Sequence, residues 1–208
     1  MTTLVARSWM TRTAAAVVAV LLVAGCSAGG VSTVTSSPTV DAELQAAYKA
    51  AGITPCPAGP ATEPVEGGLP DVALSCLDTG SQVSLAGLAT GKPRVINLWA
   101  QWCGPCRTEA PVLAAVSSQM VGKVDFLGID VSDPQPAMAI EFAKAAHWTY
   151  PQLADPEGLS KQAPISAPGL PATVFVDAGG RIVARHFGVL ETETELQGLI
   201  TKHFGVQP

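Results

Sequence analysis

The feature that most constrains this chain is a short apolar run, Val95–Trp99, which stops at Trp102-Cys103-Gly104-Pro105-Cys106 and gives way to a helical pattern. The run has the length and the β-branched start of a buried strand. Two cysteines three positions apart at a strand-to-helix turn can close a small disulfide ring. Cys103 would lie at the helix N-terminus, where unpaired N–H groups and the helix dipole favour a thiolate. The pattern therefore predicts thiol–disulfide exchange, in which one thiolate attacks a disulfide and the second thiol resolves the mixed disulfide.

The same cysteine spacing also makes half of a zinc site, so metal binding is the first alternative. A second pair of ligands with zinc spacing is missing from the sequence. Cys56 and Cys76 stand far apart, and the three histidines cluster with no other ligand (His147, His186 and His203). We therefore expect no metal and no cofactor.

The chain has five cysteines, and this odd number needs an explanation. If Cys26 is modified and Cys103 pairs with Cys106, then Cys56 and Cys76 are left for each other. Their disulfide would close a loop of about 20 residues, worth roughly 3 kcal/mol, and would imply an oxidising compartment. Two free buried cysteines are the alternative. We expect a structural role for this pair.

Residues 1–25 have the pattern of a targeting segment. Arg7 and Arg12 precede an apolar run of about 11 residues, which suits a signal peptide and falls short of the ~20 residues that span a bilayer. The run ends in Leu22-Val-Ala-Gly-Cys26, which resembles a bacterial lipobox, whose cysteine is lipidated and becomes the new N-terminus. Ordinary signal cleavage after small residues is the alternative. We expect a lipid anchor at Cys26 that holds the protein on the outer face of the bacterial cytoplasmic membrane.

Three segments follow the targeting segment. Residues 26–40 are rich in Ser, Thr and Gly and predict a flexible tether. Residues 41–69 predict a short helix, with Asp41 as N-cap and Gly52 as stop, and then a Pro/Gly-rich irregular segment. Residues 70–208 are the predicted main domain. The net charge is −5, and it becomes −7 without residues 1–25, which hold two arginines and no acids, so nucleic acid is not an expected partner.

The main domain shows an α/β pattern. Two short strands, 72–74 and 83–85, predict a hairpin before the central strand. A second buried strand at 124–129 is followed by a helix with Asp133 and Pro134 at its start, and then by a loop through residue 158. Residues 173–176 and 181–186 predict another hairpin, and Thr192-Glu-Thr-Glu195 is a capping box for a closing helix.

Four blocks of this domain resemble the extracytoplasmic, membrane-tethered thioredoxins of the TlpA type, which include ResA- and DsbE-like proteins. They are 83–93, the active-site block 97–111, Gly169-Leu-Pro-Ala-Thr-Val-Phe-Val-Asp177, and the turn 178–182. The resemblance covers about two thirds of the chain. It implies a thioredoxin fold, with a central mixed sheet flanked by helices and an N-terminal β-hairpin extension.

The resemblance also implies roles for individual residues. Cys103 would be the attacking, more exposed sulfur and Cys106 the resolving one. Pro171 would be cis and face the disulfide, with the Leu170 backbone pairing to an extended substrate segment. Trp102, Gly104 and Pro105 would contact the substrate.

Glu109 is the remaining catalytic candidate. Cytosolic thioredoxins carry a buried Asp six residues before the first motif cysteine, and this chain has Asn97, as TlpA-type proteins do. Glu109 matches an acid that TlpA-type reductases carry near the disulfide. A buried carboxylate there could hold a raised pKa and pass protons to Cys106. A solvated glutamate in the first helical turn is the alternative.

The expected activity is that of a membrane-anchored thiol–disulfide oxidoreductase. Gly104-Pro105 is the thioredoxin dipeptide, and thioredoxin has a potential near −270 mV against about −120 mV for a strong oxidant, which favours a reductant. The resemblance implies protein disulfides as substrates, as in cytochrome c maturation, and a membrane electron carrier as donor. The alternatives are an oxidant of secreted proteins, a copper metallochaperone with His147 as remote ligand, and a binding module without catalysis.

Overall fold

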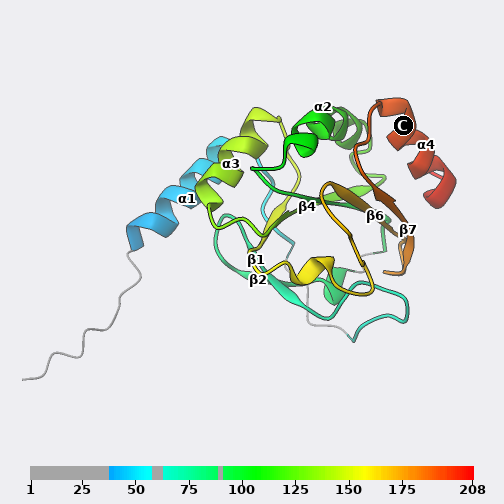
Figure 1. The fold of residues 1–208 in the computed structure, drawn as a ribbon, viewed down its shortest axis with the longest axis horizontal. Helices are drawn as coiled ribbons and strands as arrows, with labels where there is room; N and C mark the ends of the chain where they lie inside the picture. Colours follow the sequence, from blue (N-terminus) through cyan, green and yellow to red (C-terminus); the bar gives the residue numbers. More distant parts are fainter. Residues whose placement is uncertain (1–37, 58–62, 89–90) are drawn as a thin grey trace, which may run out of the picture. The chain divides into compact units, whose positions relative to one another are not determined.

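The main structural element is a mixed sheet with the strand order β2-β1-β5-β4-β3-β6-β7 (Figure 1). The computed structural model describes residues 38–57, 63–88 and 91–208, all within the unit Ser36–Pro208. The strands are β1 (Ala73–Cys76), β2 (Gln82–Ser84), β3 (Arg94–Trp99), β4 (Asp125–Val131), β5 (Gln152–Asp155), β6 (Ala172–Val176) and β7 (Ile182–Phe187). Strands β3, β4 and β5 are parallel to one another, and the remaining pairs are antiparallel.

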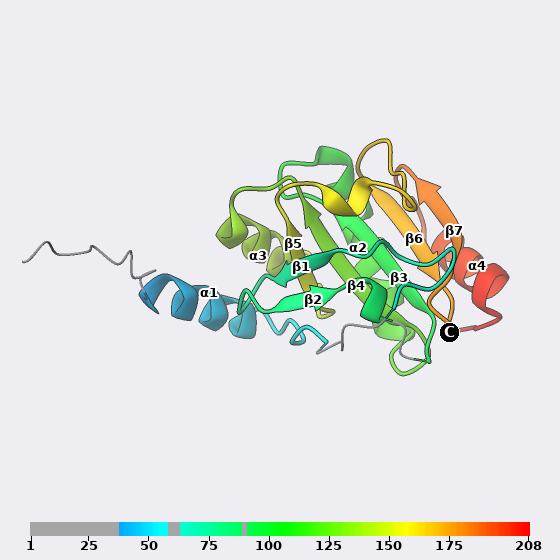
Figure 2. The same cartoon turned by 90° about the horizontal axis from the view of Figure 1, so that it is seen from below.

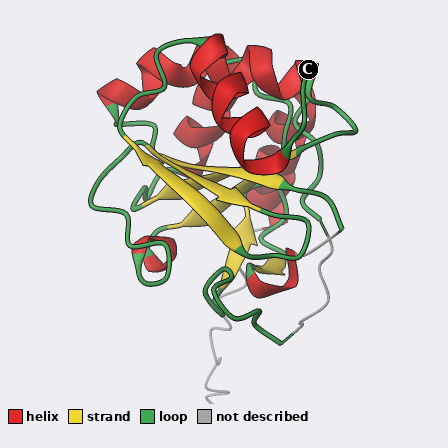
Figure 3. Ribbon diagram, turned by 90° about the vertical axis from the view of Figure 1, so that its right-hand side faces the viewer, coloured by secondary structure: helices red, strands yellow, loops and turns green. Residues whose placement is uncertain are grey.

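The longer helices cover one face of this sheet (Figure 3). They are α1 (Pro38–Ala50), α2 (Gly104–Gln119), α3 (Pro136–Ala145) and α4 (Glu193–Phe204), and buried side chains from all four join one apolar cluster. The short 3₁₀ helix η1 (Ala86–Leu88) joins the second cluster on the opposite face, together with Ile165 and Ala167 of the loop after η2 (Leu159–Lys161). Within the described part of the chain, every helix falls short of the length or apolarity that a membrane crossing requires.

The strand register brings the motif and the proline loop to one edge of the sheet. β3 and β6 run antiparallel, with Leu98 opposite Ala172. The carboxyl end of β3 therefore lies beside the start of β6. Because Cys103 follows β3 by four residues and Pro171 directly precedes β6, the fold places both at this edge.

The strand β5 differs from the sequence prediction, which treated residues 147–158 as a loop. β5 pairs with β4 on one side and with β1 on the other, so the predicted N-terminal hairpin joins the main sheet through it (Figure 2). Its polar first residue is buried because Gln152 Oε1 accepts a 3.1 Å hydrogen bond from Trp99 Nε1. These partners are distant in sequence, so the local pattern does not show the strand.

Two predicted helix starts are also wrong. α1 begins at Pro38, inside the stretch predicted to be a tether, so Asp41 lies within the helix instead of capping it. α3 begins at Pro136 instead of Pro134. The reason is that the Asp133 carboxylate binds the N–H groups of Gln135 and Gln101 and so holds this segment outside the helix.

Other predicted elements are present. Both hairpins form, and Thr192 caps α4 by accepting the Glu195 N–H at 3.2 Å. The return bond of the capping box goes to the Glu191 N–H instead of that of Thr192. The predicted signal peptide, the lipidation site Cys26 and most of the tether lie outside the described residues.

Candidate redox site

The site is built around a disulfide between Cys103 and Cys106, whose Cα atoms are 5.3 Å apart. Cys103 is the N-cap of α2, and its sulfur accepts the Cys106 N–H at 3.2 Å. Gly104 and Pro105 form the first two helical positions. Proline is suited to this place because an N–H group in the first turn has no partner within the helix. Cys103 is 4% exposed and Cys106 is fully buried. Cys103 is therefore the more accessible sulfur in the pair, although both are shielded in the oxidised form.

The loop before the disulfide is held from two sides. Its Gln101 N–H donates to Asp133 Oδ2 at 3.2 Å, and the Gln101 carbonyl accepts from the Arg107 guanidinium. Trp102 is 55% exposed, and its indole N–H donates to the Ser132 carbonyl at 3.2 Å. These bonds leave a broad aromatic surface exposed directly beside Cys103.

The loop before β6 faces the same edge. The Leu170–Pro171 peptide bond is cis, and a second cis bond, Ala163–Pro164, precedes it in the same loop. Leu170 packs against the apolar cluster that contains Cys103 and Cys106. Within the described chain, the backbone N–H and carbonyl of Leu170 make no backbone hydrogen bond. An extended peptide could pair with these free groups, as an added strand does.

Glu109 lies one helical turn after Cys106 and is fully buried. Its Oε1 accepts a 2.8 Å hydrogen bond from the Asn97 side-chain amide, and its Oε2 accepts the Leu190 N–H at 3.3 Å. Burial raises the pKa of Glu109 from its ordinary value near 4.5 to about 7, against the lowering effect of both hydrogen bonds. The solvated alternative does not hold, because this side chain is fully buried.

Glu109 has a buried phenol close by. Burial, followed by the charge of Glu109, raises the pKa of Tyr150, against the lowering effect of the Gln152 side chain. Trp99 belongs to the core, as expected, and stacks on Phe142 with ring centroids 4.9 Å apart.

The sequence did not indicate a group of acids next to this site. Asp130 is the second-last residue of β4 and is 1% exposed, and both of its carboxylate oxygens are buried. Burial, followed by the charges of Asp133 and Asp155, raises its pKa to about 8. Asp155 instead accepts bonds from the Leu159 and Ser160 N–H groups. The only sequence signal was one acid, Asp130, after the run Phe126–Ile129.

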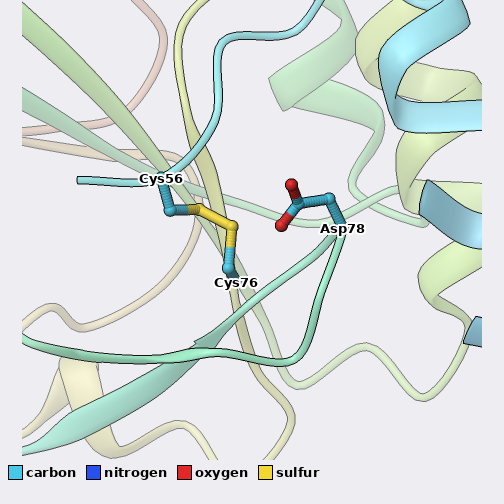
Figure 4. A group of neighbouring side chains, drawn as sticks. All are labelled: Cys56, Cys76 and Asp78. Atoms are coloured by element: carbon cyan, nitrogen blue, oxygen red, sulfur yellow. A yellow bond between two sulfur atoms is a disulfide. The ribbon is translucent and has the colours of Figure 1, made fainter. Parts of the chain in front are cut away.

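Cys56 and Cys76, the second predicted pair, are bonded to each other away from the motif. Cys56 and Cys76 form a disulfide with Cα atoms 6.0 Å apart, and Asp78 lies beside it (Figure 4). These three residues are the group with metal-compatible spacing among the described residues, and it includes neither the motif cysteines nor His147, which is exposed.

The fold and this site define a class: a thioredoxin-like protein with a paired-cysteine disulfide at the start of a helix. Residues 64–200 match the Redoxin family model, so the chain belongs to the Redoxin family. This confirms the thioredoxin-like fold expected from the TlpA-type resemblance.

Known relatives agree with this assignment. The chain is 34% identical over 101 residues to a thiol:disulfide interchange protein DsbE homolog of Paracoccus denitrificans, covering 48% of this chain and 53% of the relative. It is 32% identical over 140 residues to the thiol:disulfide interchange protein DsbE of Escherichia coli K12, covering 65% and 73%. The chain therefore spans little more than half the length of the first relative.

A solved structure is similar as well. It is that of a secreted Mycobacterium tuberculosis disulfide oxidoreductase homologous to E. coli DsbE, with 25% identity and a TM-score of 0.55. The match covers 64% of this chain and 96% of that one.

Proposed function

We propose that this chain is an extracytoplasmic thiol–disulfide oxidoreductase that reduces disulfides in other proteins through Cys103 and Cys106. The observation that carries the proposal is the disulfide at the tip of α2, with Cys103 as the N-cap. A thiolate at that position is stabilised by the free N–H groups and the positive end of the helix dipole. The names of the relatives, which describe thiol:disulfide interchange, point to the same chemistry.

The reaction has two exchange steps. In the reduced protein, the Cys103 thiolate attacks a substrate disulfide, forms a mixed disulfide and releases one substrate thiolate, which takes up a proton. The Cys106 thiol then loses its proton, and its thiolate attacks the Cys103 sulfur. The second substrate thiolate leaves, and the Cys103–Cys106 disulfide seen in the structure forms.

Glu109 is suited to take the proton of Cys106. It lies one helical turn away and has a pKa of about 7, so it can accept and return a proton at neutral pH. Its bonds to Asn97 and Leu190 would hold the carboxyl group in place during the transfer.

The substrate would be an extended protein segment. The unpaired backbone groups of Leu170 could hydrogen-bond to such a segment next to cis-Pro171, while Trp102, Gly104 and Pro105 contact it beside the sulfur. The substrate that the TlpA-type resemblance favours is apocytochrome c, whose oxidised cysteine pair would be reduced to two thiols before haem attachment.

The location follows from the sequence pattern. We propose that residues 1–25 direct export and that Cys26 carries a lipid anchor, and the secreted structural relative supports a location outside the cytoplasm. A reductant there needs electrons from a membrane carrier, because each turnover leaves the Cys103–Cys106 pair oxidised.

Trapping tests the proposal directly. The Cys106→Ala variant cannot resolve the mixed disulfide, so it should accumulate covalent adducts with exported proteins that dithiothreitol releases. A Cys103→Ala, Cys106→Ala variant is the matched control and should trap none. If Cys106→Ala traps nothing and the wild-type protein exchanges with no model disulfide, the proposed function is wrong.

The direction of the reaction needs a second measurement. We expect the Cys103–Cys106 reduction potential to lie near the thioredoxin value of about −270 mV. A potential above about −180 mV would instead assign the chain a role in forming disulfides.

A further inference from the structure

A second group of sulfur and oxygen ligands lies away from the motif. Cys56 from the segment after α1 and Cys76 at the end of β1 meet beside the carboxylate of Asp78 (Figure 4). The two sulfurs and a carboxylate oxygen all lie within 4.8 Å of one another. Neither of these cysteines belongs to the Cys103–Cys106 pair, so this group is separate from the redox motif.

The fold does not explain why the Asp78 carboxylate is partly buried beside the disulfide. It extends toward the disulfide, and its Oδ1 is buried without a hydrogen-bond partner among the described residues. Within that part of the chain, Asp78 also forms no salt bridge. A buried carboxylate oxygen normally has a donor or a cation beside it, since leaving it unpaired is unfavourable.

We propose that reduction of the Cys56–Cys76 disulfide creates a binding site for a thiophilic divalent cation, with the two thiolates and the Asp78 carboxylate as ligands. Zinc is the cation that this set fits best, because it takes sulfur and carboxylate ligands together in tetrahedral geometry. In the oxidised protein the sulfurs are bonded to each other, so the disulfide and the metal exclude one another.

The required movements are small. Two Zn–S bonds of about 2.3 Å at the tetrahedral angle place the sulfurs ~3.8 Å apart, and a Zn–O bond of about 2.1 Å gives a similar S···O distance. The ligand atoms already lie within 4.8 Å of one another. Rotation of the two cysteine side chains after reduction can therefore form the site.

One of the three ligands, Asp78, can be reached from solvent. A surface pocket is lined by Asp78 together with Tyr48, Lys49 and Pro55. The Tyr48 hydroxyl lies 4.0 Å from Cys56 Sγ, but it is engaged by the Thr54 carbonyl and the Gln152 N–H. A water molecule entering through this pocket would complete the four ligands.

The chemistry balances with a dithiol as reductant. A reduced dithiol transfers two electrons and two protons to the Cys56–Cys76 disulfide and becomes a disulfide itself. When the cation binds, both cysteines lose their protons to solvent, because thiolates are the ligands. The cation then compensates the negative charges of two thiolates and Asp78, which otherwise repel one another.

Cobalt binding tests the proposal, because Co²⁺ replaces zinc and its thiolate complexes absorb light. The protein is the full chain with Cys26→Ser, Cys103→Ser and Cys106→Ser, so that only Cys56 and Cys76 remain as thiols. After reduction with a phosphine, it should bind one Co²⁺ with a thiolate charge-transfer band, and one Zn²⁺ should abolish that band. The oxidised protein should show no such band.

Two further variants separate this site from general metal binding. Asp78→Asn should weaken Co²⁺ binding by about tenfold or more, because a charged ligand is lost. Asp71→Asn, at an exposed position on the neighbouring segment, should leave it unchanged. Equal Co²⁺ affinities in the Asp78→Asn variant and its parent would show that Asp78 is not a ligand.

Loss of structure on reduction is also informative. If the reduced protein unfolds, Zn²⁺ should restore the native near-UV circular dichroism, since the cation would bind only the folded site. Two titratable thiols with neither a cobalt band nor this recovery would overturn the proposal.

Discussion

The side-chain amide of Asn97 donates a 2.8 Å hydrogen bond to the carboxyl group of Glu109, and so connects the central strand to the helix that carries both motif cysteines. The bond fixes the carboxyl group one turn after Cys106, inside the protein. Burial outweighs this bond and the one from Leu190, and the pKa of Glu109 rises to about 7. Strand and helix together therefore place a carboxyl group with a pKa of about 7 one turn after Cys106.

Replacing this acid tests its role. In Glu109→Gln, the inflection near pH 7 in the Cys106 thiol titration should disappear, because an amide does not ionise in this pH range. Release of the mixed disulfide should slow by about tenfold or more, since general-base catalysis contributes factors of roughly 10² to 10⁴. Stopped-flow reduction of a model disulfide across pH 5–9 measures both. Glu157→Gln, at an exposed acid, is the control, and a titration curve identical to wild type in Glu109→Gln would remove the proton-transfer role.

Asp130 should make folding stability depend on pH. Its pKa in the folded protein, about 8, lies above its ordinary value near 3.8, so the folded state holds the proton more tightly than the unfolded state. The stability that this proton provides is complete below about pH 4 and is lost as the pH rises toward 8.

Asp130→Asn removes that dependence, because an amide cannot ionise. Relative to wild type, the free energy of unfolding of the variant should rise between pH 4 and 8 by on the order of 5 kcal/mol, because the two pKa values differ by about four units and each unit is worth roughly 1.4 kcal/mol. Guanidinium denaturation at a series of pH values measures this difference. Asp71→Asn should follow the wild-type curve, and a parallel curve for Asp130→Asn would show that Asp130 does not carry the raised pKa.

The two tryptophans before the motif should differ in their effects. Trp102 is exposed, so Trp102→Ala should change the free energy of unfolding by less than about 0.5 kcal/mol while slowing reduction of protein disulfides several-fold. Trp99 is buried against Phe142 and Trp148, and Trp99→Ala should lose about 3–5 kcal/mol. Denaturation and a protein-disulfide reduction assay on both variants test the contrast. Unchanged kinetics in Trp102→Ala would place substrate contact elsewhere.

The Cys56–Cys76 disulfide should contribute stability without contributing to exchange at Cys103. Under oxidising conditions, Cys56→Ser with Cys76→Ser should lower the free energy of unfolding by about 3 kcal/mol, because the bridge closes a loop with a sequence separation of 20. The rate of disulfide reduction by the Cys103–Cys106 pair should stay the same at a temperature where the variant is folded. A slower rate in the folded variant would link the two disulfides.

Local patterns were enough to predict much of the fold. The strand ending at Trp99, the helix after the motif and both hairpins have their signals within a few residues of sequence. β5 could not be predicted in this way, because Gln152 is buried by its bond to Trp99 and the strand's neighbours are β1 and β4. The start of α3 was predicted wrongly for the same reason, because the Asp133 carboxylate also accepts a hydrogen bond from Gln101, 32 residues away.

For the site, too, local sequence patterns predicted some residues and long-range contacts determined others. The motif identified Cys103 and Cys106 from the sequence, the TlpA-type resemblance identified Pro171, and their catalytic roles remain predictions. The burial of Glu109 depends on Leu190, 81 residues away, and could not be inferred from helix position alone. The Asp130 environment is made by Asp133, in the loop after β4, and Asp155, at the end of β5, so only the folded chain reveals it.

The bond between Cys56 and Cys76 also changes how the molecule would respond to tension. A pull on the chain from its N-terminal side passes along α1 to Cys56 and then crosses the sulfurs directly into β1. Residues 57–75 would bear no load while that bond is intact, and a protease cut among them would leave both pieces attached. Only reduction would transfer the force to the chain between the two cysteines.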